Sequence, residues 1–120
     1  MLRRFVVLFH EHPAGDHWDF MLETGIALTT WAVPPQPLPL QSFECRVKKL
    51  PDHRRYYLDY EGAISNHRGF VRRLDSGTYQ TEKTECFRLY GKLFNGILST
   101  QQLDNDFVMF FYQSCLTGVQ

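Results

Sequence analysis

The densest group of side chains that could do chemistry lies close to the N-terminus. It contains three of the five histidines, His10, His12 and His17, together with Asp19. If residues 17–23 form a strand, His17 and Asp19 point to the same side, roughly 6–7 Å apart at the backbone, so both can reach one ion. A third ligand, His10 or His12, would complete a catalytic-type site for manganese, zinc or iron, with positions left open for water and substrate.

A second polar alternation begins at His53 and continues through Arg55 and Tyr57 on the same predicted face. A histidine could protonate a leaving oxygen, and an arginine could hold a phosphate through paired N–H groups. An ordinary solvent-exposed face would show the same pattern.

A third polar group contains Arg68, Arg72 and Arg73. Guanidinium groups match the geometry of phosphate oxygens, so these arginines are candidate phosphate contacts. A solvated strand edge explains Arg72 and Arg73 equally well. Gly69 is expected to mark a β-bulge.

The elements that carry these residues are predicted to be strands. No segment of about 12 residues keeps a helical apolar stripe, whereas many short aromatic or β-branched runs end at Gly, Pro, Asn or Asp. Four prolines between Val33 and Leu40 indicate an extended crossing loop. Tight turns or bulges are expected at Asp75-Ser76-Gly77 and Asn95-Gly96. The predicted strands are 3–10, 17–23, 26–33, 44–49, 55–61, 69–75, 78–81, 86–90, 93–99 and 106–112.

These strands predict an all-β fold, a closed or partly open β-barrel of about eight or more short strands. The chain has 120 residues, which suits one domain, expected over residues 1–113, with a flexible tail over 114–120.

Composition excludes several classes of protein. Thirteen basic and thirteen acidic residues give no net charge, so contact with nucleic acid is expected to be local, without extended binding to a duplex. The three cysteines form no C-x-x-C pair, which argues against thiolate zinc sites and a disulfide framework. The N-terminal apolar run is too short to span a membrane or serve as a signal peptide. We therefore expect a cytoplasmic monomer.

Several motifs resemble the 3′-phosphoesterase domain of bacterial ligase D, a multidomain DNA ligase of non-homologous end joining. The family typically reads F-V-V-x-x-H, H-Y-D-F-R-L-E, W-A-V-P, D-H-x-x-x-Y-x-x-F-E-G and W-D-x-G-T-Y. The similar segments here are F-V-V-L-F-H at 5–10, H-W-D-F-M-L-E at 17–23, W-A-V-P at 31–34, D-H-(x)3-Y-(x)2-Y-E-G at 52–62 and D-S-G-T-Y at 75–79.

The resemblance implies a compact β-barrel with Mn²⁺-dependent activity, although Zn²⁺ or another divalent ion could serve. Family members remove a 3′-terminal ribonucleoside and then the remaining 3′-phosphate from nucleic-acid ends. Carried over, the metal ligands would be His10, His17 and Asp19, while His53 would contact the scissile phosphate with Tyr57 beside it. The implied partners are nucleic-acid 3′ ends and a possible separate DNA ligase or polymerase.

The sequence departs from the family pattern in ways that bear on activity. His10 and His17 are seven residues apart where the family has six, so His12 could replace His10. Met21 and Cys45 stand where arginines are expected, and we expect the family's N-terminal arm to be missing. We therefore expect phosphomonoesterase activity to outweigh phosphodiesterase activity, with Arg68 or Arg55 replacing the lost arginine.

Two other functions fit the same residues. The chain could be a catalytically impaired module that keeps the metal and binds 3′ ends. It could also be a non-haem iron oxygenase, because His-x-Asp with a distant histidine is the facial-triad pattern. In that case His53 or His67 would be the third ligand.

Overall fold

The structure is a computed structural model that describes residues 2–116. Its regular elements are strands, apart from a single turn of 3-10 helix, η1. In chain order they are β1 (Arg3–Glu11), β2 (His17–Thr24), β3 (Ala27–Val33), β4 (Phe43–Arg54), η1 (Arg55–Leu58), β5 (Gly62–Ala63), β6 (Phe70–Lys83), β7 (Cys86–Gly91), β8 (Asn95–Gln102) and β9 (Phe107–Ser114).

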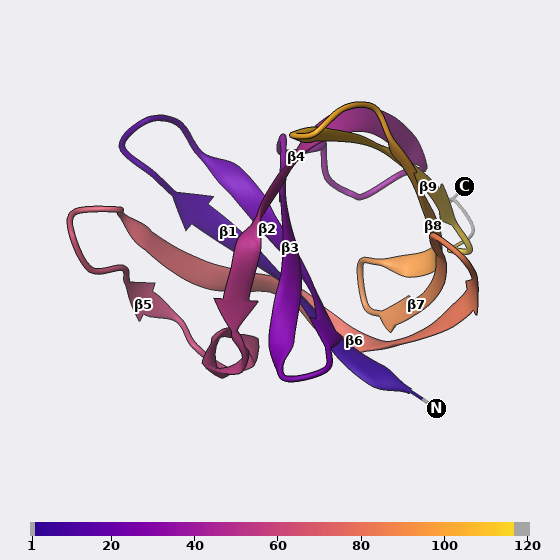
Figure 1. The fold of residues 1–120 in the computed structure, drawn as a ribbon, viewed down its shortest axis with the longest axis horizontal. Helices are drawn as coiled ribbons and strands as arrows, with labels where there is room; N and C mark the ends of the chain where they lie inside the picture. Colours follow the sequence, from indigo (N-terminus) through magenta and orange to yellow (C-terminus); the bar gives the residue numbers. More distant parts are fainter. Residues whose placement is uncertain (1, 117–120) are drawn as a thin grey trace.

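Eight of the strands close into an antiparallel barrel, and the short β5 adds to the edge of β6 (Figure 1). The order around the barrel is β1-β2-β3-β4-β9-β8-β7-β6, and β6 pairs with β1 to close the circle. The predicted all-β barrel is therefore confirmed. Closure gives each of these eight strands a neighbour on both sides along at least part of its length.

Aromatic side chains fill the barrel interior. Trp18, Phe20 and Leu22 alternate along β2 and all point inward, as the period of a strand requires. Phe94 lies against Phe20 edge-to-face, with the ring centroids 5.2 Å apart. Because the interior is filled by side chains, the barrel is a packed core that holds the outward-facing residues in place.

The outward-facing residues of β1 and β2 form a second apolar cluster. Met21 packs there with Val6, Leu8 and Leu58, all nearly inaccessible to solvent. Figure 1 shows the β1–β2 and β5–β6 hairpins extending together beyond one side of the barrel. Together with η1, these hairpins add a partial second layer over the outer face of the sheet.

The predicted strand over 55–61 is wrong. Residues 55–58 form η1, and Leu58 is its one buried residue. Tyr57 and Tyr60, three residues apart, pack with Leu58 against the outer cluster, which suits the repeat of a 3-10 turn. Tertiary packing here overrides the alternating pattern in the sequence.

The tight turn or bulge expected at 75–77 does not lie at those residues, because β6 runs from Phe70 to Lys83. Its register with β1 shifts between Val7 and Leu8, which leaves Leu74 as a bulge. The turn or bulge expected at Asn95-Gly96 is wrong, because both residues belong to β8 and pair in regular register.

Gly69 ends the loop between β5 and β6 and does not form a bulge within a strand. Its φ is +82°, and a Cβ there would lie 1.7 Å from the Glu11 carbonyl oxygen. The glycine is thus required by the close approach of the β1 backbone.

Beyond the strands, β9 ends at Ser114, and residues 117–120 of the expected tail lie outside the described residues. Cys45, Cys86 and Cys115 are free thiols. In the described part of the chain, no helix is long and apolar enough to cross a membrane.

Candidate metal centre

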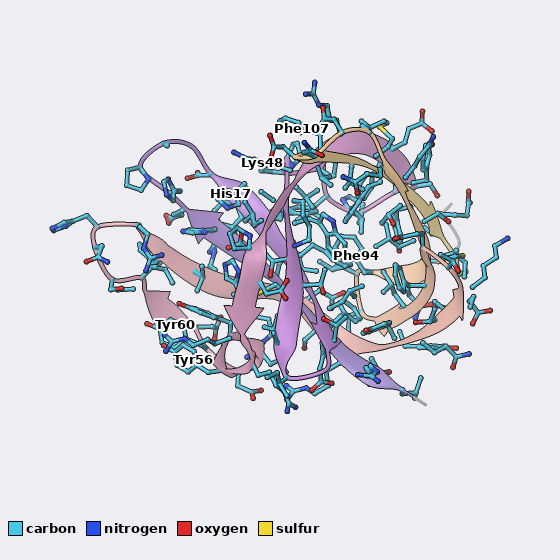
Figure 2. All side chains as sticks on the ribbon, in the orientation of Figure 1. His17, Lys48, Tyr56, Tyr60, Phe94 and Phe107 are labelled. Atoms are coloured by element: carbon cyan, nitrogen blue, oxygen red, sulfur yellow. The ribbon has the colours of Figure 1, made fainter. Side chains whose placement is uncertain are left out.

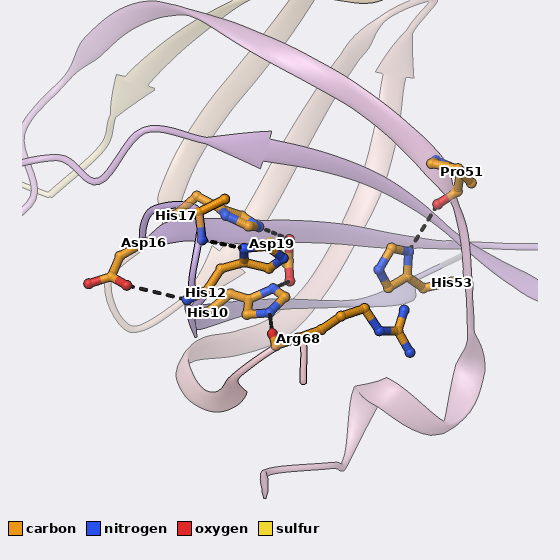
Figure 3. Close-up of polar contacts among 9 residues, drawn as sticks. His10, His12, Asp16, His17, Asp19, Pro51, His53 and Arg68 are labelled. Carbon is orange, nitrogen blue, oxygen red and sulfur yellow. Dashed lines mark hydrogen bonds and ion pairs between the residues drawn. The ribbon is translucent and has the colours of Figure 1, made fainter. Parts of the chain in front are cut away.

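The antiparallel pairing of β1 and β2 brings the predicted metal ligands together. His10 lies directly opposite His17, and Asp19 is two residues further along β2 on the same outer face. One donor atom from each of the three side chains lies within 4.8 Å of the other two. Figure 3 shows the two imidazole rings converging on the Asp19 carboxylate.

Asp19 connects the two histidines through both of its oxygens. Its Oδ2 lies 2.8 Å from His10 Nδ1, and its Oδ1 lies 2.9 Å from His17 Nε2. The Asp19 side chain is only 4% exposed. Burial by itself would raise the pKa of Asp19, but the hydrogen bonds from His10 and His17 outweigh it and lower the pKa to about 2. The carboxylate is therefore ionised and available as a ligand.

Both ring nitrogens of His10 face groups that can only accept hydrogen bonds. Nδ1 faces the Asp19 carboxylate, and Nε2 lies 2.8 Å from the backbone carbonyl of Arg68. The Asp19 hydrogen bond raises the pKa of His10 above its usual value, against the effect of burial, and the Arg68 carbonyl raises it further. With Nε2 donating to Arg68, a cation can replace the proton at Nδ1.

This donor set fits a divalent metal ion. Two imidazoles and one carboxylate suit Mn²⁺, Zn²⁺ or Fe²⁺ and leave coordination positions open. The hydrogen bond from His10 Nε2 to the Arg68 carbonyl is the outer contact by which metal-bound histidines are usually oriented.

His12 lies beside the cluster but outside the group of converging donors. Its ring centroid is 5.2 Å from that of His10 and 6.1 Å from that of His17. Its Nδ1 accepts a hydrogen bond from the Ala14 backbone N–H at 3.0 Å, which leaves Nε2 as its free ring nitrogen. Among the described residues the geometry thus groups His10, rather than His12, with His17 and Asp19. A non-haem iron oxygenase would need His53 or His67 as its third ligand, and neither residue belongs to that group.

A cavity of about 470 Å³ opens next to the three ligands, between the outer face of the sheet and the η1–β5–β6 segment. The candidate phosphate-handling residues His53, Tyr57 and Arg68 also line it, as do His12 and Met21. The structure therefore brings the metal cluster and the candidate phosphate-handling residues to one site, although they come from segments far apart in the chain.

His53 is oriented for proton transfer by its backbone. Its Nδ1 lies 2.9 Å from the Pro51 carbonyl oxygen, which can only accept, so Nδ1 carries the proton in the neutral ring. The remaining nitrogen, Nε2, can hold or release a proton in the cavity. Tyr57 packs edge-on against His53, with ring centroids 5.7 Å apart, and fixes the plane of the imidazole.

Arg68 contributes to the site twice. Its backbone carbonyl accepts from His10, and its side chain lines the cavity that contains His53 (Figure 3). The guanidinium donates to Ser65, to the carbonyl at 2.8 Å and to the hydroxyl at 3.1 Å.

Arg55 lies elsewhere. It forms an ion pair with Glu23 and is not among the residues that line the cavity. Met21, at the position where the family pattern has arginine, is fully buried in the outer apolar cluster. Cys45 packs against the barrel interior, and burial raises the pKa of its thiol to about 11. The structure therefore places an apolar or buried side chain at both positions that lost an arginine.

Lys48, which no sequence motif singled out, also lines the cavity. Asp19, Ala32 and Lys48 form one row across β2, β3 and β4. The alternation of β4 could have shown that residues 46 and 48 share a face. Which face they share depends on the pairing of β4 with β3, which no local pattern reveals.

The chain is similar to known proteins over much of its length. Residues 9–110 match the family model of the DNA Ligase D 3′-phosphoesterase domain. The chain is 39% identical over 82 residues to the multifunctional non-homologous end joining protein LigD of Mycobacterium bovis. It has the same identity, over the same length, to the multifunctional non-homologous end joining DNA repair protein LigD of Mycobacterium tuberculosis. These alignments cover 66% of this chain and only 11% of each relative.

Proposed function

Because the chain belongs to the DNA ligase D 3′-phosphoesterase domain family, we propose that it is a metal-dependent phosphoesterase acting on nucleic-acid 3′ ends in DNA end processing. The observation that carries this proposal is the convergence of His10, His17 and Asp19 beside a cavity that also contains His53. We further propose that the protein works in the cytoplasm as a monomer, beside a separate ligase or polymerase.

His10, His17 and Asp19 would hold the cation, with Mn²⁺ as the preferred ion and Zn²⁺ or another divalent ion as alternatives. When bound, the ion supplies Lewis-acid polarisation of a phosphoryl oxygen. Asp19 keeps both imidazoles directed at the same point, and the Arg68 carbonyl holds the outer nitrogen of His10.

The residues on the other side of the cavity handle the proton and the phosphate. As water attacks the phosphorus, the doubly protonated His53 ring donates its Nε2 proton to the oxygen that leaves, and the neutral ring keeps the Nδ1 proton that binds the Pro51 carbonyl. Tyr57 holds the His53 ring in place. Arg68 takes over the phosphate contact that the family pattern assigns to the Met21 position, because its side chain lines the same cavity.

We propose that phosphomonoesterase activity exceeds phosphodiesterase activity. Met21 and Cys45 offer no charge to a phosphate, and Arg68 already donates to Ser65. With fewer fixed cations, the site has less to hold a bulky phosphodiester in line, whereas a terminal 3′-phosphate can reach the metal directly. The same shortage of cations favours a second candidate function, a module that binds metal and 3′ ends with little turnover.

The test is hydrolysis of a 3′-phosphate on a primer-template after removal of metal by a chelator. Mn²⁺ should restore release of phosphate by the wild-type protein, and His17→Ala should abolish it. His67→Asn is the matched control, because His67 lies outside the cavity lining and its φ of +57° suits asparagine. Strong Mn²⁺-restored turnover by His17→Ala would reject the site. Binding of the 3′-phosphorylated end without turnover by the wild type would identify the second candidate.

A further inference from the structure

A positively charged strip leads out of the cavity across the outer face of β4 and β9. We call this strip the basic track and define it by Lys48, Arg46 and Phe107. Lys48 lies opposite Phe107 in the pairing of β4 with β9, and Arg46 is the next outward-facing residue along β4. Figure 2 shows Lys48 and Phe107 side by side, with His17 nearby.

Lys48 joins the track to the metal cluster. It shares a row with Asp19, and only Ala32 lies between them. Two strand spacings separate Lys48 from Asp19, about 10 Å at the backbone, and the small Ala32 side chain leaves the floor between them open. Lys48 is exposed, lines the cavity and has no ion-pair partner among residues 2–116. Its ammonium group can therefore contact a phosphate close to the cation.

Arg46 provides the second charge of the track. Its guanidinium lies over the Phe107 ring, 3.8 Å from the centroid, which holds it flat on the surface. Asp104 Oδ1 accepts the backbone N–H groups of Asp106 and Phe107 at 2.9 and 2.8 Å, which lower the pKa of this carboxyl, and the charge of the nearby Arg46 lowers it further. Arg46 has no ion-pair partner in the described part of the chain.

The spacing of these two charges suits a nucleic-acid backbone. Residues 46 and 48 are two positions apart on one strand, about 7 Å along it, which is close to the spacing of successive phosphates in an extended single strand. The next outward position along β4 is Glu44, an exposed acid that ends the positive stretch. The track is therefore long enough for two phosphates.

We propose that Lys48 and Arg46 bind the two phosphates next to the 3′ end of a single nucleic-acid strand, whose terminal phosphate lies at the metal cluster. This inference rests on the proposed function for the position of the 3′ end. It adds the path of the strand, which leaves the cavity over β4 and β9 with a base placed against the Arg46–Phe107 pair.

A second way out of the cavity leads over η1, past Tyr57 to the exposed Tyr56 and to Tyr60. Tyr60 stacks on Tyr56 with centroids 4.9 Å apart, so one face of the Tyr56 ring is already covered. Arg54 also lies 5.6 Å from the centre of the Tyr56 ring. A base would have to displace these neighbours, whereas the basic track offers its charges without rearrangement.

The experiment measures binding of 3′-phosphorylated oligothymidylates of one to six nucleotides to EDTA-treated protein by competition fluorescence anisotropy, at several salt concentrations. The variants are Lys48→Met and Arg46→Met. Lys49→Met is the matched control. Lys49 follows Lys48 on the same strand, but its ammonium group is already bound to the Leu50 carbonyl and Asp52. Tyr56→Ala tests the other way out.

Wild-type affinity should rise with length over the first two added phosphates and then level off. Lys48→Met and Arg46→Met should each weaken binding of the six-nucleotide strand about 3–10-fold, the effect expected for one charged contact. Each should reduce the slope of log affinity against log salt by about 0.7. Lys49→Met and Tyr56→Ala should bind like the wild type.

The inference is overturned if Lys48→Met and Arg46→Met bind like the wild type, if only Tyr56→Ala weakens binding, or if the wild type binds none of these strands. Parallel assays with Mn²⁺ separate it from the proposed function. Absence of phosphate release, with binding that still depends on Lys48 and Arg46, would reject the chemistry and support the track. Normal phosphate release, with binding that neither Lys48→Met nor Arg46→Met weakens, would support the proposed function and reject the track.

Discussion

At the scale of single residues, the site is organised by one buried carboxylate. Asp19 would be costly to bury alone, and its two hydrogen bonds to His10 and His17 offset that cost. The same contacts hold one donor atom from each of the three candidate ligands within 4.8 Å of the other two, without an ion. A preformed set of this kind needs little rearrangement, which favours tight and specific binding.

His53 offers a test of proton donation that does not depend on metal affinity. The 3′ oxygen of the sugar leaves the phosphorus as a basic alkoxide unless it is protonated, whereas p-nitrophenyl phosphate releases a stable phenolate. His53→Ala should therefore lower kcat for a 3′-phosphorylated oligonucleotide by on the order of 100-fold, within the range for general acid catalysis. For p-nitrophenyl phosphate the loss should be less than about tenfold. The measurement is steady-state hydrolysis of both substrates with saturating Mn²⁺.

An equal loss of kcat on both substrates would show that His53 positions the phosphate rather than donating a proton. Tyr57→Phe serves as the control, because it keeps the ring that packs against His53. It should preserve the difference between the two substrates.

At the scale of elements, the strands that carry the site could be predicted from sequence because each has one buried face and one functional face. The alternation of Trp18, Phe20 and Leu22 with His17 and Asp19 fixed both the strand and its phase, and the structure confirms the core side of that prediction. The bounds of β1, β2 and β3 agree with the predicted strands within one residue.

The elements that close the cavity were not predictable in the same way. The alternation at 55–61 has the period of a strand. Residues 55–58 nevertheless form η1, in which Leu58 is buried in the apolar cluster on the outer face of the sheet. The position of Lys48 depends on how β4 pairs with β3, a long-range register that local sequence does not encode. Sequence thus located the candidate ligands, and only the folded barrel shows which other residues lie near them.

The D-S-G-T-Y segment illustrates a motif whose role is structural. The buried Asp75 carboxylate accepts the backbone N–H groups of Lys92, Leu93 and Phe94 at 3.1, 3.0 and 2.7 Å, and so holds the turn between β7 and β8. Asp75→Ala would leave these donors without their partner, and should lower the free energy of unfolding by about 3 kcal/mol or more. Urea denaturation measures this change.

Ser76→Ala is the control for that prediction, because Ser76 is the exposed neighbour on the same strand. It should change the free energy of unfolding by less than about 0.5 kcal/mol. Asp75 does not line the metal cavity, so the fraction of Asp75→Ala that remains folded should keep its Mn²⁺-dependent activity. A stable Asp75→Ala protein that lacks activity would instead assign this carboxylate to the site.

At the scale of the whole molecule, the residues that stabilise the fold fill the inside of the barrel, and the residues of the candidate site lie on its outside. Its interior is filled by rings such as Phe20, Phe94 and Phe110, so the site lies on the outside, where β1 and β2 extend past the barrel and η1 and β5 cover them. The candidate ligands lie on β1 and β2. The covering segment, from η1 to the start of β6, provides Tyr57 and Arg68. Substitutions in the covering segment should therefore change substrate binding more readily than they change the fold.

Binding of a metal ion at this site should raise the thermal stability of the whole protein. An ion that binds only the folded chain stabilises it by about 2.7 kcal/mol at a hundredfold excess over its Kd. For a domain of this size, that corresponds to a rise in Tm on the order of 10 °C. Mn²⁺ added to chelator-treated protein should produce such a rise in differential scanning calorimetry, and the rise should grow with the logarithm of the Mn²⁺ concentration. His17→Ala removes one ligand and should nearly eliminate it, whereas His67→Asn should retain it. A rise of the same size in His17→Ala would mean that the ion binds elsewhere on the molecule, and the assignment of His10, His17 and Asp19 would then fail whatever the activity assays show.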